Sequence, residues 1–87
     1  MFVILVYDIN VKRVAKVLKC CRKYLYWVQN SVLEGEISET NLKKLKMELD
    51  SITKDNEDSV IIYSFRTTKY SKRETLGIKK GGDENII

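Results

Sequence analysis

Residues 2–10 read Phe-Val-Ile-Leu-Val-Tyr-Asp-Ile-Asn. The near-continuous apolar run from Phe2 to Tyr7 predicts a strand that is buried on both faces in the centre of a sheet. The run ends on a carboxylate, Asp8. Asn10 follows as the expected N-cap of a helix, because its side-chain oxygen can accept a hydrogen bond from a free backbone N–H. A buried strand followed directly by a helix is therefore the first unit of the fold.

The expected first helix is amphipathic. On a helical projection, apolar side chains share one face and lysines the opposite face, with Arg13 at the boundary. The apolar face consists of Val11, Val14, Leu18 and Cys21, and the basic face of Lys12, Lys16, Lys19 and Lys23. The helix is expected to pack on the sheet and to leave a basic surface outside, which can be simply solvated or can contact an anionic partner.

The middle of the chain predicts a hairpin and a second helix. Residues 25–37 are rich in aromatic and β-branched side chains and are too long for one typical strand. They predict two short antiparallel strands that turn around residues 29–31, with Gly35 allowing a bulge or a close approach. Ser38 is the expected cap of a helix that runs to about Ser51. The core face of this helix is Leu42, Leu45, Leu49 and Ile52.

The remaining residues complete the predicted topology. The polar residues 53–58 predict a loop, and the apolar run from Val60 to Phe65 predicts a central strand beside the first one. The order β-α-β-β-α-β is the ferredoxin-like arrangement of the α+β class. Residues 75–78 are a candidate edge or exchanged strand, and residues 79–87 are expected to be a flexible tail. We therefore predict one domain over residues 1–78.

Composition indicates a small, moderately basic protein. The 87 residues suffice for one domain with a modest core, so dimerisation would be a natural way to bury more surface. The 16 Lys and Arg against 12 Asp and Glu give a net charge of +4 and a pI of about 9.1. This balance also suits an ordinary solvated surface, and clustering of the charges is the better indicator of nucleic-acid binding.

Several classes of site are excluded by the residue types present. There is no histidine, which removes Ser-His and Cys-His catalysis and the commonest zinc ligand. Cys20 and Cys21 are adjacent, without the spacing of a disulfide framework or a zinc site, and are expected to be structural in a reducing compartment. Neither a secretory leader nor an apolar run of about 20 residues is visible, so we expect a soluble, cytoplasmic protein that makes no membrane contact.

Asp8 is the candidate catalytic and metal-binding residue. It is the only acid among the first 33 residues, and six basic residues separate it from Glu34. An anionic partner drawn to this region would meet one carboxylate, which suggests a metal-dependent site acting on nucleic acid. Oxygen ligands without histidine favour Mg²⁺, with Mn²⁺ as a substitute, over zinc. The alternatives are that Asp8 caps the following helix or pairs with Arg13.

Three segments carry a further signal. They are Tyr-Asp-Ile at residues 7–9, Lys-Arg-Val at residues 12–14, and Trp-Val-Gln-Asn-Ser-Val-Leu-Glu-Gly-Glu at residues 27–36. Together they resemble the Cas-two family, the smaller of the two universal CRISPR adaptation proteins. The resemblance runs from the first residue to about Phe65. One difference is Leu33, where the family usually has phenylalanine.

The resemblance implies a ferredoxin-like homodimer that works with the adaptation integrase, the Cas-one family, to insert new spacers. It also implies metal-dependent endonuclease activity on single-stranded RNA or double-stranded DNA, with Mg²⁺ bound by the strand-terminal aspartate, here Asp8. In the family's dimers the final strand crosses to the partner's sheet, and here that strand would lie around residues 76–78. Because one carboxylate is a thin metal site, we expect a twofold axis to bring Asp8 of both chains to one ion.

Nucleic-acid contacts are expected from basic residues in two segments. They are Lys12, Arg13, Lys16, Arg66, Lys69, Lys72 and Arg73. Two classes of function stay open: an endonuclease that works through Asp8, and a non-catalytic dimeric scaffold that holds duplex DNA and bridges copies of the integrase. A toxin-like ribonuclease on the same fold, outside any adaptation complex, is a third and weaker hypothesis.

Overall fold

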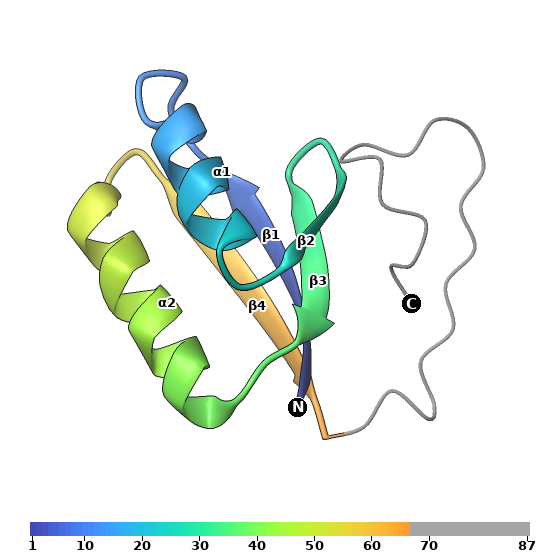
Figure 1. The fold of residues 1–87 in the computed structure, drawn as a ribbon. Helices are drawn as coiled ribbons and strands as arrows, with labels where there is room; N and C mark the ends of the chain where they lie inside the picture. The colour runs from blue at the N-terminus through green and yellow to red at the C-terminus, as the bar shows by residue number, and fades with distance from the viewer. Residues whose placement is uncertain (67–87) are drawn as a thin grey trace.

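Six helices and strands make up residues 1–66, the part of the chain that the computed structural model describes (Figure 1). In chain order they are β1 (Phe2–Asp8), α1 (Val14–Arg22), β2 (Tyr26–Gln29), β3 (Val32–Glu36), α2 (Glu39–Ile52) and β4 (Ser59–Phe65). This order confirms the predicted ferredoxin-like arrangement. The expected strand at residues 75–78 and the expected tail at residues 79–87 lie outside the described residues. Within residues 1–66, no helix is long and apolar enough to cross a membrane.

The four strands form one antiparallel sheet in the order β2-β3-β1-β4. β1 lies in the interior of the sheet, where Leu5 is opposite Leu33 of β3 on one side and Ile62 of β4 on the other. Both helices cover the same face of the sheet (Figure 1). The opposite face, which we call the helix-free face, carries no described helix.

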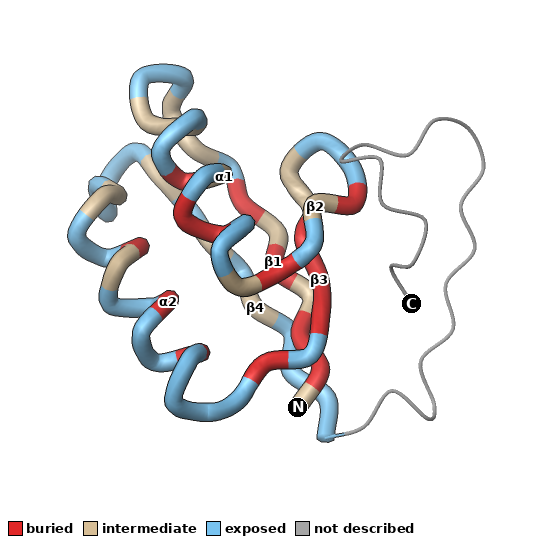
Figure 2. Tube along the Cα trace, viewed as in Figure 1, coloured by how far each residue is buried: buried red, intermediate tan, exposed pale blue. Residues whose placement is uncertain are grey.

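The core lies between the sheet and the two helices. Val3, Leu5 and Tyr7 alternate along β1 and belong to the main buried cluster. The helices contribute Val17, Cys20, Cys21, Leu42, Leu45 and Leu49. Figure 2 shows buried residues along the strands and on the sides of the helices that face them. Because side chains alternate along a strand, the residues of β1 between these core positions, and Asp8 at its end, point to the helix-free face.

α1 begins later than the sequence predicts. Its N-cap position is Arg13, whose side chain makes no capping bond, and residues 11–13 form a turn ahead of the helix. Asn10 nevertheless makes the predicted bond to a free backbone N–H: its side-chain oxygen accepts from Lys12 N at 2.9 Å, and its backbone oxygen accepts from Arg13 N at 2.8 Å and from Val14 N at 3.1 Å. The prediction for Val11 is also wrong, because this turn leaves its side chain 82% exposed rather than on the core face.

β2 and β3 form the predicted hairpin. Asn30 in the turn has a φ of 39°, in the left-handed region that asparagine tolerates better than most residues. A register shift between Trp27 and Gln29 marks a β-bulge. The close approach predicted at Gly35 is confirmed, because a Cβ there would lie 3.4 Å from a ring carbon of Tyr26.

α2 lies close to its predicted bounds. Ser38 is its N-cap, and the Ser38 hydroxyl accepts from Asn41 N at 3.1 Å. At the other end, the backbone N–H and the hydroxyl of Thr53 each donate to Leu49 O at 2.9 Å. The chain then enters the loop of residues 53–58, which leads to β4.

β4 pairs with β1 as predicted, but it is an edge strand of the sheet formed by residues 1–66, not a central one. The prediction was wrong because both faces of β4 carry large apolar side chains. Val60 and Ile62 pack against the core. On the helix-free face, Ile61, Tyr63 and Phe65 are 49%, 53% and 41% exposed. An apolar run in the sequence cannot distinguish this arrangement from a strand enclosed on both faces.

Candidate active site at the end of the central strand

Asp8 is the last residue of β1 and lies opposite Ser59, the first residue of β4. The neighbouring Tyr7 packs into the core, so Asp8 points to the helix-free face. Its side chain is exposed and makes no hydrogen bond or ion pair within residues 1–66. Both carboxylate oxygens are therefore available to a metal ion or a proton.

The Arg13 guanidinium binds two acids in the loop before β4. Nε donates to Asp58 Oδ2 at 2.6 Å, and Nη2 donates to Asp58 Oδ1 at 3.1 Å and to Glu57 Oε1 at 3.0 Å. The Asp58 side chain is completely buried and that of Arg13 is 12% exposed. The hydrogen bond from Arg13 is the main reason that the pKa of Asp58 lies well below its usual value. The same two acids raise the pKa of Arg13.

These contacts exclude the two structural roles considered for Asp8. The N-cap position of α1 is Arg13, and no side chain caps the helix there. Arg13 pairs with Asp58 and Glu57, and not with Asp8. Asp8 is thus an acid that the described fold leaves unused.

A basic surface follows Asp8 along α1. Lys12 and Lys16 are exposed, and neither forms an ion pair within the described part of the chain. Lys16, Lys19 and Lys23 line a groove of about 300 Å³ between α1 and α2. Glu48 is the acid in this groove, and it is bound by Lys23 and Tyr24, whose hydrogen bonds lower its pKa. Within residues 1–66, Lys12, Lys16 and Lys19 therefore form no ion pair.

Of the other basic residues predicted to contact nucleic acid, the two that the structure describes do not lie on this surface. Arg13 is held by its internal ion pairs. Arg66 is exposed and directly follows Phe65, which is opposite Phe2 at the start of β1. It therefore lies at the far end of the sheet, roughly 20 Å along the strand from Asp8. Lys69, Lys72 and Arg73 lie outside the described residues.

The acids of one chain do not form a complete metal site. Among residues 1–66, no group of three or more His, Cys, Asp or Glu side chains is placed to hold a metal ion. Glu57 and Asp58 are bound to Arg13, whereas Asp8 is a free carboxylate at the end of a strand. Mg²⁺ often takes only one or two carboxylates from the protein and keeps several waters. The residues fit such an ion where a second copy of the chain supplies the second carboxylate.

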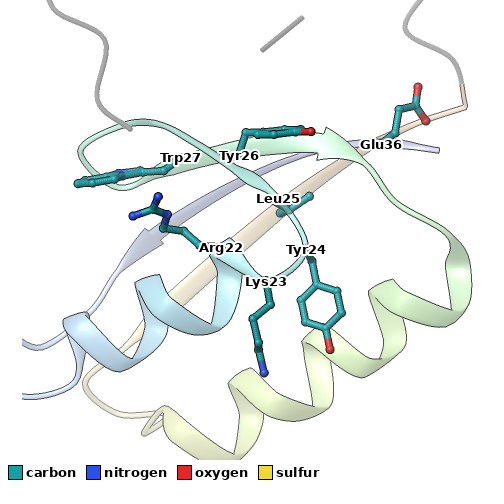
Figure 3. Close-up of a pocket in the computed structure, with 7 residues that line it drawn as sticks. All are labelled: Arg22, Lys23, Tyr24, Leu25, Tyr26, Trp27 and Glu36. Carbon is teal, nitrogen blue, oxygen red and sulfur yellow. The ribbon is translucent and has the colours of Figure 1, made fainter. Parts of the chain in front are cut away.

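A cavity of about 470 Å³ lies beside β2, at the edge of the sheet away from β4 (Figure 3). It is lined by Arg22, Lys23, Tyr24, Leu25, Tyr26, Trp27 and Glu36. The Arg22 guanidinium lies 5.5 Å from the centre of the Trp27 ring, and Trp27 Nε1 donates to Asn30 O at 2.7 Å. Lys23 and Tyr24 point toward α2, where they bind Glu48. Lys23, Tyr24 and Trp27 are thus bound to groups beside the cavity, and Asp8 is not among the residues that line it.

The helix-free face carries an exposed apolar patch on β4, which consists of Ile61, Tyr63 and Phe65, and Tyr26 is exposed on the same face at the opposite edge of the sheet. The register places Tyr63 opposite Ile4 and Ile61 opposite Val6. Asp8 follows these β1 positions on the same face, at the edge of the patch. Any molecule that covers the patch would therefore also approach Asp8.

The sequence profile of the family described as CRISPR associated protein Cas2, the Cas-two family, matches residues 1–73. The chain belongs to the Cas2 family. Relatives from Dictyoglomus turgidum and Thermotoga maritima are 56% and 55% identical over 87 residues, with 100% of both chains covered. Each is named CRISPR-associated endoribonuclease Cas2.

Solved Cas2 structures share the fold. A protein described as "Crystal structure of cas2" superposes with a TM-score of 0.83 at 47% identity, covering 100% of this chain and 98% of its own. Cas2 of Streptococcus pyogenes at pH 6.5 gives 0.78 at 32% identity, covering 88% and 100%. The resemblance drawn from residues 7–9, 12–14 and 27–36 is thereby confirmed.

Reasoning from the sequence missed the acids that hold Arg13 in this Cas2-family chain. The polar composition of residues 53–58 predicts a loop and nothing more. The usable signal was the adjacent pair Glu57 and Asp58, directly before a strand expected to pair with β1. That pairing brings the loop beside the start of α1, and therefore beside Arg13.

Proposed function

We propose that this Cas2-family protein is a metal-dependent endoribonuclease that acts as a homodimer in CRISPR adaptation. The observation that carries the proposal is the carboxylate of Asp8, which is exposed and unbound within residues 1–66 at the end of the central strand. Family membership supports the role in CRISPR systems, and the names of the full-length relatives support RNA cleavage.

The homodimer is proposed from the apolar patch. Soluble monomers rarely expose a contiguous surface of large apolar side chains such as Ile61, Tyr63 and Phe65. A second copy packed on the helix-free face would bury this patch in a twofold interface. Since Asp8 lies at the edge of the same face, the same twofold contact would bring two Asp8 carboxylates toward each other.

Two Asp8 carboxylates would hold one Mg²⁺ or Mn²⁺ ion, with substrate phosphate and water completing the shell. The bound ion would supply an acidified water and neutralise charge on the phosphate. The chain itself has two tasks. Asp8 would hold the ion and would accept a proton from the attacking water. Lys12 and Lys16, which are exposed and unpaired, attract and bind the phosphate backbone.

The decisive experiment removes the charge of Asp8 at nearly constant volume. Wild-type protein, Asp8→Asn and Asp50→Asn are incubated with end-labelled single-stranded RNA in Mg²⁺ or in EDTA. Asp50 is a matched control because it is an exposed acid on α2 and forms no ion pair within residues 1–66. We expect Asp8→Asn to lose cleavage by about a hundredfold or more, whereas Asp50→Asn cleaves like wild type. A folded, dimeric Asp8→Asn variant that cleaves normally in Mg²⁺ would refute the proposal.

A second candidate function is a non-catalytic scaffold that holds duplex DNA and bridges copies of the Cas-one integrase. The lysines of α1 that form no ion pair within residues 1–66 favour it, because they form a basic surface that needs no metal. Arg66, Lys69, Lys72 and Arg73 are proposed as a second set of backbone contacts. The two functions separate in a spacer-insertion assay with the integrase. If Asp8→Asn supports insertion but not RNA cleavage, the scaffold is the role that adaptation requires.

A further inference from the structure

Asp58 connects three segments at the Asp8 end of the sheet. The last cross-strand pair between β1 and β4 is Asp8 and Ser59. Directly beyond it, Asp58 Oδ1 accepts a hydrogen bond from Asn10 N at 2.8 Å. Asp58 Oδ2 accepts from Lys54 N, also at 2.8 Å. The side chain thus extends the contact between the two strands by one step and anchors the loop that enters β4.

Each oxygen of Asp58 has a second partner, the guanidinium of Arg13. The carboxylate therefore accepts four hydrogen bonds, two from backbone N–H groups and two from Arg13. Glu57 adds an outer contact, since its Oε1 accepts from Arg13 and from the side chain of Asn10 at 3.1 Å. A completely buried carboxylate with this many donors has one favourable orientation.

Two consequences for Asp8 follow from this geometry. The segment that leaves Asp8, residues 9–13, is bound to Asp58 at both Asn10 and Arg13, so the end of β1 is attached to the loop before β4. In addition, Nε and Nη2 of the Arg13 guanidinium donate to Asp58 and Glu57, which directs this side chain toward the loop before β4. Arg13 therefore pairs with these two loop acids and does not pair with Asp8.

We propose that Asp58 is a positioning residue for Asp8: it holds the strand end in place and binds the Arg13 guanidinium, so that the Asp8 carboxylate stays free for a divalent cation. This inference rests on the proposed metal-dependent function of Asp8. Outer-shell partners of metal ligands commonly change metal affinity or activity by 10–100-fold when they are substituted. Asp58 acts through the backbone and through Arg13, so we expect the lower end of that range.

The test is the variant Asp58→Asn, which keeps the side-chain volume. It replaces one carboxylate oxygen, which now accepts hydrogen bonds, with an NH₂ group that cannot accept them. Asp55→Asn is the matched control, because Asp55 is an exposed acid of the same loop with no hydrogen bond or ion pair within residues 1–66. Two measurements are made on the full chain, below its unfolding temperature. One is the Mg²⁺ concentration that gives half-maximal RNA cleavage. The other, without RNA, is the Mn²⁺ concentration that broadens the amide NMR signals of Asp8 and Ile9.

We expect Asp58→Asn to raise both concentrations about tenfold, whereas Asp55→Asn leaves them at the wild-type values. A merely structural role would lower the unfolding temperature and leave the Mn²⁺ titration of the folded protein unchanged. An unchanged Mn²⁺ titration in folded Asp58→Asn therefore overturns the inference. Wild-type protein that shows neither Mn²⁺ broadening at Asp8 nor cleavage would instead overturn the proposed function, and the positioning role with it.

Arg13→Lys keeps the test decisive if Asp58→Asn does not fold. Lysine keeps the positive charge and leaves the two backbone hydrogen bonds of Asp58 intact, but it cannot bind both carboxylate oxygens through a planar fork. We expect a rise of about threefold in the Mn²⁺ concentration, a smaller effect because half of the network survives. A wild-type Mn²⁺ titration in Arg13→Lys would then overturn the inference, and a change confined to the KM for RNA would assign Arg13 to phosphate binding.

Discussion

Mixed dimers of wild-type and Asp8→Asn chains offer a quantitative test of the shared site. Within residues 1–66 one chain has no group of three or more His, Cys, Asp or Glu side chains that could hold a metal ion, and Asp8 is a free carboxylate at the end of its strand. If one ion needs both Asp8 side chains, a dimer with a single Asp8 is inactive. If each Asp8 works alone, a mixed dimer keeps half of the activity.

The expected numbers follow from random pairing in a twofold dimer. After full exchange of an equimolar mixture, about one quarter of the dimers have two Asp8 residues, about half have one and about one quarter have none. A shared site therefore predicts about 25% of the wild-type activity at the same total protein concentration, and independent sites predict about 50%. The twofold difference is well within the precision of an initial-rate measurement.

The assay uses two tagged forms that are co-refolded and then checked for exchange by pulling down each tag. RNA cleavage is measured at saturating Mg²⁺ across mixing ratios, and activity is plotted against the fraction of wild-type chains. A shared site gives a parabola in this plot, and independent sites give a straight line. A mixture of wild type with Asp50→Asn controls for dilution and should keep full activity. A straight line for the Asp8→Asn mixtures, with exchange shown to be complete, would refute the two-carboxylate site.

Three further predictions concern stability and reactivity. Leu45→Ala should lower the free energy of unfolding by about 2–5 kcal/mol, because the Leu45 side chain is fully buried. Met47 is 73% exposed on the same helix, so Met47→Ala should change this free energy by less than about 0.5 kcal/mol. Urea denaturation at one fixed protein concentration measures both. The folded-state pKa of Asp58 lies below its usual value of 3.8, so its contribution to stability is present above about pH 4 and is lost as the pH falls further. Urea midpoints compared at pH 5 and pH 3 should therefore fall more for wild type than for Asp58→Asn, and parallel curves would contradict this. Burial raises the pKa of the Cys21 thiol to about 12, so iodoacetamide at pH 8 should alkylate it only after unfolding, as peptide mass spectrometry can show.

Most of the fold could be predicted from the sequence because its patterns are local. The capping residue Ser38 and the i, i+3, i+7 spacing of Leu42, Leu45 and Leu49 predict α2 almost to its ends. The start of α1 could not be predicted as well. Asn10 does accept a hydrogen bond from a free backbone N–H, that of Lys12, but the turn of residues 11–13 lies between Asn10 and the first residue of α1.

The candidate site was predictable only in part. Asp8 could be chosen because a carboxylate directly after a buried strand is unusual and local in sequence. Its freedom from Arg13 could not, because that depends on Asp58, 45 residues further along the chain from Arg13. The edge position of β4 was also beyond reach, since a strand with apolar side chains on both faces, such as Ile61 and Ile62, is equally expected in the centre of a sheet.

The ion pairs of Arg13 affect how alanine scanning of this protein must be interpreted. Arg13→Ala would remove a positive charge and at the same time leave the buried carboxylate of Asp58 without its counterion. A loss of activity in that variant would combine a folding defect with any change in RNA affinity. Lys12 and Lys16 are exposed and unpaired within residues 1–66, so removing their charge reports on phosphate contact alone. A count of the positive residues at the start of α1 therefore overstates the charge that a phosphate backbone would meet, because Arg13 is already paired with acids of the same chain.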